Sequence, residues 1–233
     1  MFDRSFIEKI ETMAAPRVIE TPQGTFTNQD FRRIEEKMAV TLTLNTLSGL
    51  VAMIKHENKE YNTPLYVRIT SPTQIDVFGK IRDDSQREQP FAARAVLPQF
   101  RFDSYIPVED MIISLKARFA QTEDRDYLLR LLGNITDNQS VQTKDDGITQ
   151  SATIRSGIQL VGEERIKPVV SLKPYRTFLE VEQPESDFLI RLKEGYAALY
   201  EADGGAWQNE AMANIGDLLR EMLKDTDNVI IVE

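Results

Sequence analysis

The strongest constraint on the fold is a helical pattern that runs from residue 107 to residue 135. Pro107 suits the first position of a helix, and the acidic residues that follow it complement the helix dipole. A single helix over this range would be about 43 Å long. Thr122 offers a second N-cap, which would instead give two helices that meet near Gln121. Apolar residues recur at helical spacing at Val108, Ile112, Leu115, Phe119, Leu128, Leu129, Leu131 and Leu132.

Segments of alternating apolar and polar residues flank this pattern on both sides, which is typical of β-strands with one buried face. They cover residues 65–70, 74–81, 91–97, 141–144, 148–155, 169–172, 175–182, 187–193, 199–201 and, as a short apolar run that predicts a buried strand, 229–232. Asp145-Asp146-Gly147 predicts a hairpin, because glycine accepts the positive φ of the turn. Together the segments predict an α+β fold with a long central helix and an antiparallel β-sheet.

Two parts of the chain are predicted to extend from the body. Pro16 ends an N-terminal helix whose apolar stripe consists of Phe2, Phe6, Ile10 and Met13. Residues 64–98 alternate on either side of a polar tip at residues 83–89, which has no apolar residue to bury. This favours an extended β excursion, an arm rather than a core layer. We therefore predict a single domain over residues 1–233, with an N-terminal arm at 1–39 and the excursion at 64–98.

The charge of the chain argues against a general affinity for nucleic acid. Asp and Glu number 37 against 28 Lys and Arg, and the resulting net charge of −9 opposes attraction to phosphate backbones. Arginines that could contribute to a basic patch form no run, at Arg32, Arg33, Arg82, Arg87, Arg94 and Arg101. The sequence contains no secretory signal and no apolar stretch of roughly 20 residues. We expect a soluble, cytoplasmic protein that has no membrane partner.

The residue types that support most enzyme chemistry are missing. The chain has no cysteine, which excludes disulfides, thiolate nucleophiles and cysteine-based zinc sites. His56 is the only histidine, at the charged end of a predicted helix, so catalytic triads and two-histidine metal sites are excluded. Acidic groups at residues 83–84, 123–126, 145–146 and 163–164 lack the spacing of a calcium-binding loop and are expected to be structural. We predict no catalytic residue, no metal and no cofactor.

A glycine-rich turn before the helix of Ala211 is the candidate binding site. Asp203, Gly204 and Gly205 could present backbone N–H groups to the phosphate of a small nucleotide, and Trp207 could stack on its base. The complete fingerprints of phosphate-binding and dinucleotide-binding loops are both absent. A tight turn followed by core packing of Trp207 is the alternative interpretation.

Four stretches resemble an uncharacterised family of tailed-phage and prophage proteins, the YfdQ-like group: residues 46–51, 100–119, 175–184 and 202–207. The resemblance implies a phage origin, and hence the cytoplasm of a bacterial host, but carries over no catalytic motif. The order of the predicted elements is also similar to the capsid and encapsulin shell fold of tailed phages. There, an extended loop precedes a long spine helix, and the likeness is one of fold only.

These observations lead to one main hypothesis and one alternative. The main hypothesis is a non-enzymatic phage protein that self-assembles into a homo-oligomer, with a capsid-like or shell-forming structural role as its most specific form. The alternative is an accessory phage protein that binds and sequesters a nucleotide signal of the host, and so counteracts host defence, or that assists phage DNA metabolism.

Overall fold

The computed structural model describes residues 3–21, 24–27, 38–58, 63–82, 85–136, 140–145, 150–156, 159–193 and 195–233. Contacts divide the chain into two units, residues 1–38 and residues 39–233. The first unit contains helix α1 (Arg4–Ala14) and an antiparallel hairpin of β1 (Val18–Thr21) and β2 (Gly24–Thr27). No residue of α1 is buried. Phe2, which the sequence places on the stripe of this helix, lies outside the described residues.

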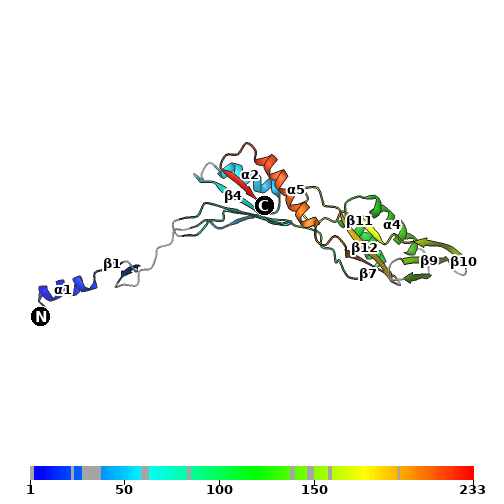
Figure 1. Ribbon diagram of the computed structural model, residues 1–233, viewed down its shortest axis with the longest axis horizontal. Helices are drawn as coiled ribbons and strands as arrows, with labels where there is room; N and C mark the ends of the chain where they lie inside the picture. Colours follow the sequence, from blue (N-terminus) through cyan, green and yellow to red (C-terminus); the bar gives the residue numbers. More distant parts are fainter. Residues whose placement is uncertain are drawn as a thin grey trace. The chain divides into compact units, whose positions relative to one another are not determined.

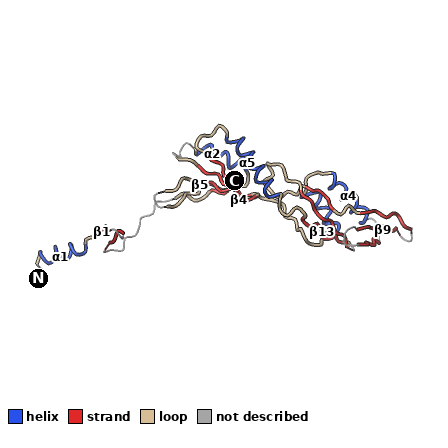
Figure 2. Tube along the Cα trace, viewed as in Figure 1, coloured by secondary structure: helices blue, strands red, loops and turns tan. Residues whose placement is uncertain are grey.

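A five-stranded mixed sheet forms the first layer of the second unit, in the order β14-β4-β5-β6-β3. Helices α2 and α5 lie together on one side of this sheet (Figures 1 and 2). The elements are β3 (Leu42–Leu44), α2 (Leu47–Glu57), β4 (Leu65–Ser71), β5 (Gln74–Phe78), β6 (Phe91–Arg94), α5 (Trp207–Leu223) and β14 (Val229–Val232). Strands β4, β5 and β6 pair antiparallel, whereas β14 and β3 join the two edges in parallel.

The alternation in β4 and β5 decides which face of the sheet the helices cover. Leu65, Val67 and Ile69 point toward α2 and α5, as do Ile75 and Val77, and all five are buried. The structure corrects the expectation that residues 64–98 form an arm rather than a core layer, because their strands are the centre of this sheet. Of the polar tip, residues 85–89 are described and residues 83–84 are not.

A second, antiparallel sheet of four strands packs against helices α3 and α4 in the same unit. Its elements are β7 (Ile106–Pro107), α3 (Val108–Arg118), α4 (Glu123–Thr136), β11 (Val169–Leu172), β12 (Ser186–Lys193) and β13 (Tyr196–Glu201). Met111 and Leu115 of α3 and Leu128 of α4 are buried with Phe188 and Leu199 of the sheet. The α+β class predicted from the sequence is confirmed.

The central helical pattern consists of two helices. Phe119 leaves α3 in an extended conformation, with φ −129° and ψ 136°, and forms an isolated bridge with Pro174. Thr122 Oγ1 then accepts a hydrogen bond from Arg125 N at 3.1 Å, which caps the start of α4. The sequence was compatible with one helix or with two, and the N-cap at Thr122 accounts for the two helices that are observed.

Two further segments differ from the sequence prediction. Residues 175–182 are turns rather than a strand, because the buried side chain of Gln183 bonds the backbone of Arg176, Thr177, Phe178 and Val181. Strand β14 is only partly buried, since it lies at the edge of the five-stranded sheet.

The predicted hairpin near Asp145 is present in a three-stranded antiparallel sheet of β8 (Ser140–Asp145), β9 (Gln150–Ser156) and β10 (Gln159–Arg165). Asp145 pairs with Gln150, and the turn itself, residues 146–149, lies outside the described residues.

Candidate functional site

The predicted glycine turn connects β13 to α5 and is held together by Asp203. Gly204 and Gly205 have φ of 62° and 82°, in the left-handed region that favours glycine. Asp203 Oδ1 accepts a hydrogen bond from Gly205 N at 3.0 Å, and Oδ2 accepts one from Trp207 N at 3.4 Å. The backbone oxygen of Asp203 accepts a third bond, from Ala206 N at 3.2 Å.

These hydrogen bonds use the groups that a phosphate would need. Gly205 N and Trp207 N already bond a carboxylate, while Gln208 N and Asn209 N bond backbone oxygens of the same turn. A phosphate at this position would also face the negative charge of Asp203. The geometry therefore favours the tight-turn interpretation, and nucleotide binding at Asp203, Gly204, Gly205 and Trp207 stays a prediction.

Arg176 completes this cluster, and sequence reasoning missed it. Its guanidinium carbon lies 3.9 Å from the centre of the Trp207 ring and 5.6 Å from that of Phe188. Arg176 Nη1 donates to Glu201 Oε1 at 2.6 Å, Nη2 contacts Ser186 Oγ, and Nη2 lies 3.8 Å from Asp203 Oδ2. Only 9% of the arginine side chain is exposed. Trp207 is thus stacked on an arginine of its own chain.

The charges of the cluster influence one another. Burial lowers the pKa of Arg176, and the carboxylates of Glu201 and Asp203 oppose that shift. Burial alone would raise the pKa of Asp203. Hydrogen bonds from Gly205, Ser186 and Trp207, together with the charge of Arg176, outweigh it and hold the pKa of Asp203 below its usual value. The charged contacts of this cluster link β12, β13 and α5.

Arg176 also borders a cavity of about 300 Å³. Phe100 and Phe102, whose ring centroids lie 4.7 Å apart in an edge-to-face arrangement, form part of its wall with Tyr175 and Arg118. Among the described residues that line the cavity, the phenol of Tyr175 is the one hydroxyl group, and there is no carboxylate or histidine. The cavity offers an apolar wall with cationic groups, but no arrangement of a nucleophile with a base.

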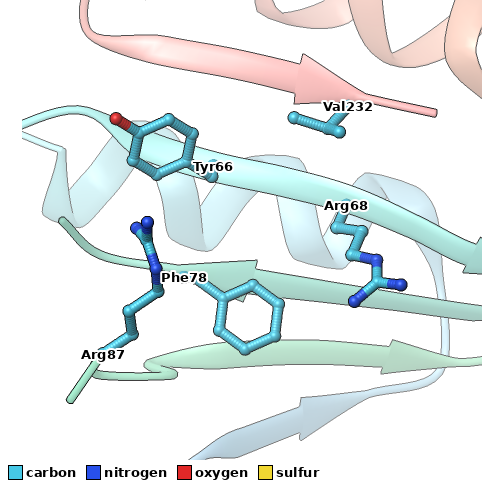
Figure 3. A pocket seen from close by; sticks show the side chains of 5 residues that line it. All are labelled: Tyr66, Arg68, Phe78, Arg87 and Val232. Carbon is cyan, nitrogen blue, oxygen red and sulfur yellow. The ribbon is translucent and has the colours of Figure 1, made fainter. Parts of the chain in front are cut away.

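A second hollow, of about 340 Å³, lies on the face of the five-stranded sheet that points away from α2 and α5. Figure 3 shows its lining side chains, Tyr66 and Arg68 of β4, Phe78 of β5, Arg87, and Val232 of β14. Tyr66 and Phe78 are direct partners in the strand register. The guanidinium carbon of Arg87 lies 5.3 Å from the centre of the Tyr66 ring, and Arg87 Nη1 donates to Gly79 O at 3.0 Å.

A polar cluster centred on Asp76 adjoins this hollow. Asp76 accepts hydrogen bonds from Gln89 Nε2 at 3.0 Å and Thr70 Oγ1 at 2.8 Å, and it also pairs with Arg94. Arg68 faces Asp76 in the strand register but forms no hydrogen bond or ion pair with any described residue. Sequence reasoning did not select these residues, because it placed the segment in an arm. The signal was present in the alternation of Tyr66 and Arg68 with buried residues.

The remaining sequence candidates have structural positions. His56 is exposed in the last turn of α2. Asp124 binds Lys167 Nζ at 2.7 Å and accepts from Ser171 N at 2.7 Å, which ties the start of α4 to β11. Over the described residues, no group of three acidic or histidine side chains could hold a metal ion. Asp83, Asp84 and Asp146, and the side chains at 163–164, lie outside the description.

Comparison with known proteins returns no match from a family model, a curated protein or a solved structure. Within the described parts of the chain, no helix is both long and apolar enough to cross a membrane. The function must therefore be inferred from the chain's own geometry.

Proposed function

We propose that the protein is a non-enzymatic, phage-encoded protein that self-assembles, with the N-terminal unit of one copy attached to a neighbouring copy. The exposed apolar face of α1 carries this proposal. Phe6, Ile7, Ile10 and Met13 are between 48% and 70% exposed, and the helix has no buried residue. A capsid-like or shell-forming assembly is the most specific form of the proposal. The element order that suggested it supports it less than the sequence implied, because residues 64–98 form the centre of a sheet and residues 107–135 form two helices.

The two faces of α1 differ sharply in character. Phe6, Ile10 and Met13 share one side at helical spacing, whereas Arg4 and Glu8 form an ion pair of 2.9 Å on the other. An isolated helix of 11 residues is marginal in water. Burying the apolar face against a partner would stabilise the helix, since a unit of 38 residues is below the size at which domains usually fold alone.

A second copy of the chain is the occupant we assign to this face. When the N-terminal unit of one copy binds a different surface of the next copy, the contact is heterologous. Such contacts close into rings or shells when they repeat around an axis. Absence of catalysis is part of the proposal, since the chain has no cysteine and its single histidine is exposed at the end of α2.

Light scattering coupled to size exclusion, with negative-stain microscopy, tests the proposal. Ile10→Glu places a charge on the apolar face, and we expect it to reduce the assembly to a monomer of 26.6 kDa. Thr12→Glu is the matched control, because it adds the same charge to the same helix outside the apolar face. A wild-type protein that is strictly monomeric at high concentration would contradict the proposal, as would equal effects of the two variants.

The nucleotide-signal alternative has less support in the geometry, because Asp203 occupies the N–H groups of the glycine turn. A nucleotide that bound there would raise the melting temperature by mass action. The same protein samples can be screened for such a rise, and a reproducible one would restore this alternative.

A further inference from the structure

We propose that the open face of the five-stranded sheet binds single-stranded nucleic acid, with bases stacked on Tyr66 and Phe78 and phosphates held by Arg68 and Arg87. This site is separate from the apolar face of α1 and goes beyond self-assembly. The negative net charge predicts no general affinity for nucleic acid. The proposed site depends instead on a local arrangement of positive charges.

The aromatic side chains are placed for stacking. Tyr66 and Phe78 lie directly opposite each other on adjacent central strands, on the face that α2 and α5 leave open. Both rings are partly exposed. Neighbouring aromatic rings on a sheet surface can each accept an unstacked base, and this stacking depends little on sequence because every base has a π-face.

The charge around these rings is positive although the chain as a whole is acidic. The described residues that line the hollow include Arg68 and Arg87 and no carboxylate (Figure 3). The adjacent acid, Asp76, is engaged by Arg94, Gln89 and Thr70. Neither Arg68 nor Arg87 forms an ion pair with a residue that the structure describes. Their positive charge beside the rings is complementary to a phosphate backbone.

The shape of the site favours a single strand. Bases in a duplex are already stacked, so flat rings on a sheet surface cannot reach their faces, whereas a single strand can turn its bases onto them. Val232 and Ile230 of β14 are 41% and 45% exposed beside the rings and extend the apolar surface. A hollow of about 340 Å³ that is open to solvent suits one or two bases of a longer strand.

Fluorescence anisotropy with labelled oligo(dT) tests the site, and oligo(rU) shows whether the sugar matters. We expect saturable binding that weakens between about 50 and 200 mM salt, with the two phosphate contacts contributing about −1.4 to the slope of log K against log salt. Tyr66→Leu and Phe78→Leu keep an apolar side chain but remove the ring, and each should weaken binding about 5-fold or more. Arg68→Ala should reduce the salt slope by about 0.7.

Matched controls come from the four-stranded sheet and from the segment that precedes its strand β7. Tyr196→Leu removes an exposed ring, and Arg101→Ala removes an exposed arginine with the same change in net charge. Neither should change binding more than twofold. The site variants are also tested in the Ile10→Glu background, where binding should persist, so that a failure of assembly and a failure of this site are told apart.

Four outcomes would overturn the inference. The first is no saturable binding of either oligonucleotide at low salt, and the second is an equal loss in site and control variants. The third is competition by poly-glutamate as effective as by oligo(dT), which would assign the face to an acidic protein segment. Tighter binding of duplex than of single strand would count against it in the same way.

Discussion

Replacing Arg176 with alanine removes a buried cation that joins β12, the end of β13 and the start of α5. The side chain contributes hydrogen bonds to Glu201 and Ser186, and its guanidinium stacks on Trp207. The substitution leaves Asp203, whose side chain is only 13% exposed, without its cation. We expect the Arg176→Ala protein to fold with lower stability and with altered packing at Trp207.

The magnitude follows from burial. Breaking a buried ion pair by removing one partner costs about 3–5 kcal/mol, because the remaining charge is left without compensation. Glu201 is 34% exposed and can regain water, and Arg176 Nε has no hydrogen-bond partner among the described residues to lose. The lower end of the range applies, about 3 kcal/mol. For a chain of this length that lowers the melting temperature by about 6–12 °C.

Trp207 is the only tryptophan, so its fluorescence reports directly on the contact that is removed. Urea unfolding followed by this fluorescence gives the free energy of unfolding, and the native emission maximum should move to longer wavelength as the ring gains water. Arg176→Lys keeps the charge but loses the planar stacking group, and should lie between wild type and Arg176→Ala. Arg101→Ala, an exposed control, should change stability by no more than about 0.5 kcal/mol. An Arg176→Ala protein within that margin, with unchanged native emission, would refute the reasoning.

Two further predictions concern the ends of helices and the response to acid. Glu180 accepts hydrogen bonds from Leu47 N at 2.5 Å and Ser48 N at 2.8 Å at the start of α2. Glu180→Ala should therefore lower the free energy of unfolding, measured in urea, by about 1–2 kcal/mol. A loss below a few tenths of a kcal/mol would contradict this role. The pKa values of Asp124 and Asp203 lie below the ordinary value of 3.8, so their stabilising contribution is present above that pH and is lost as the pH falls through the lowered folded values. Asp203→Asn should flatten the fall in stability below about pH 4, and an unchanged acid transition would show that Asp203 does not contribute.

The sequence predicted several elements well because their signals are local. The face of α5 formed by Ala211 and Ile215 is buried as its spacing indicates, and β8 pairs antiparallel with β9 as the sequence Asp145-Asp146-Gly147 predicts. The N-terminal helix likewise follows from its apolar stripe and from Pro16. Each of these depends on neighbours within a few residues in the sequence.

The errors came from contacts between residues far apart in the sequence. Periodicity placed strands at residues 65–70 and 74–81, but it could not show that β14, about 160 residues later, pairs with β4 and that α5 covers the same sheet. The polar tip then suggested an arm. At residues 175–182, hydrogen bonds from the buried side chain of Gln183 outweighed the strand propensity of the segment. The position of Arg176 against Trp207 depends on that turn and has no local signal.

The way α5 and β14 complete the five-stranded sheet has a consequence for the order of events on the ribosome. Strands β3 to β6 are synthesised early, but the end of α5, the helix that shields Leu65 and Val67, lies about 130 residues after β6. At roughly 5–20 residues per second, that interval lasts about 6–26 s. The core formed by α3, α4, β11, β12 and β13 is encoded entirely within the interval. The core in the middle of the chain can therefore fold before α5 has left the exit tunnel. During that interval, only α2 is available to cover the apolar face of β4 and β5.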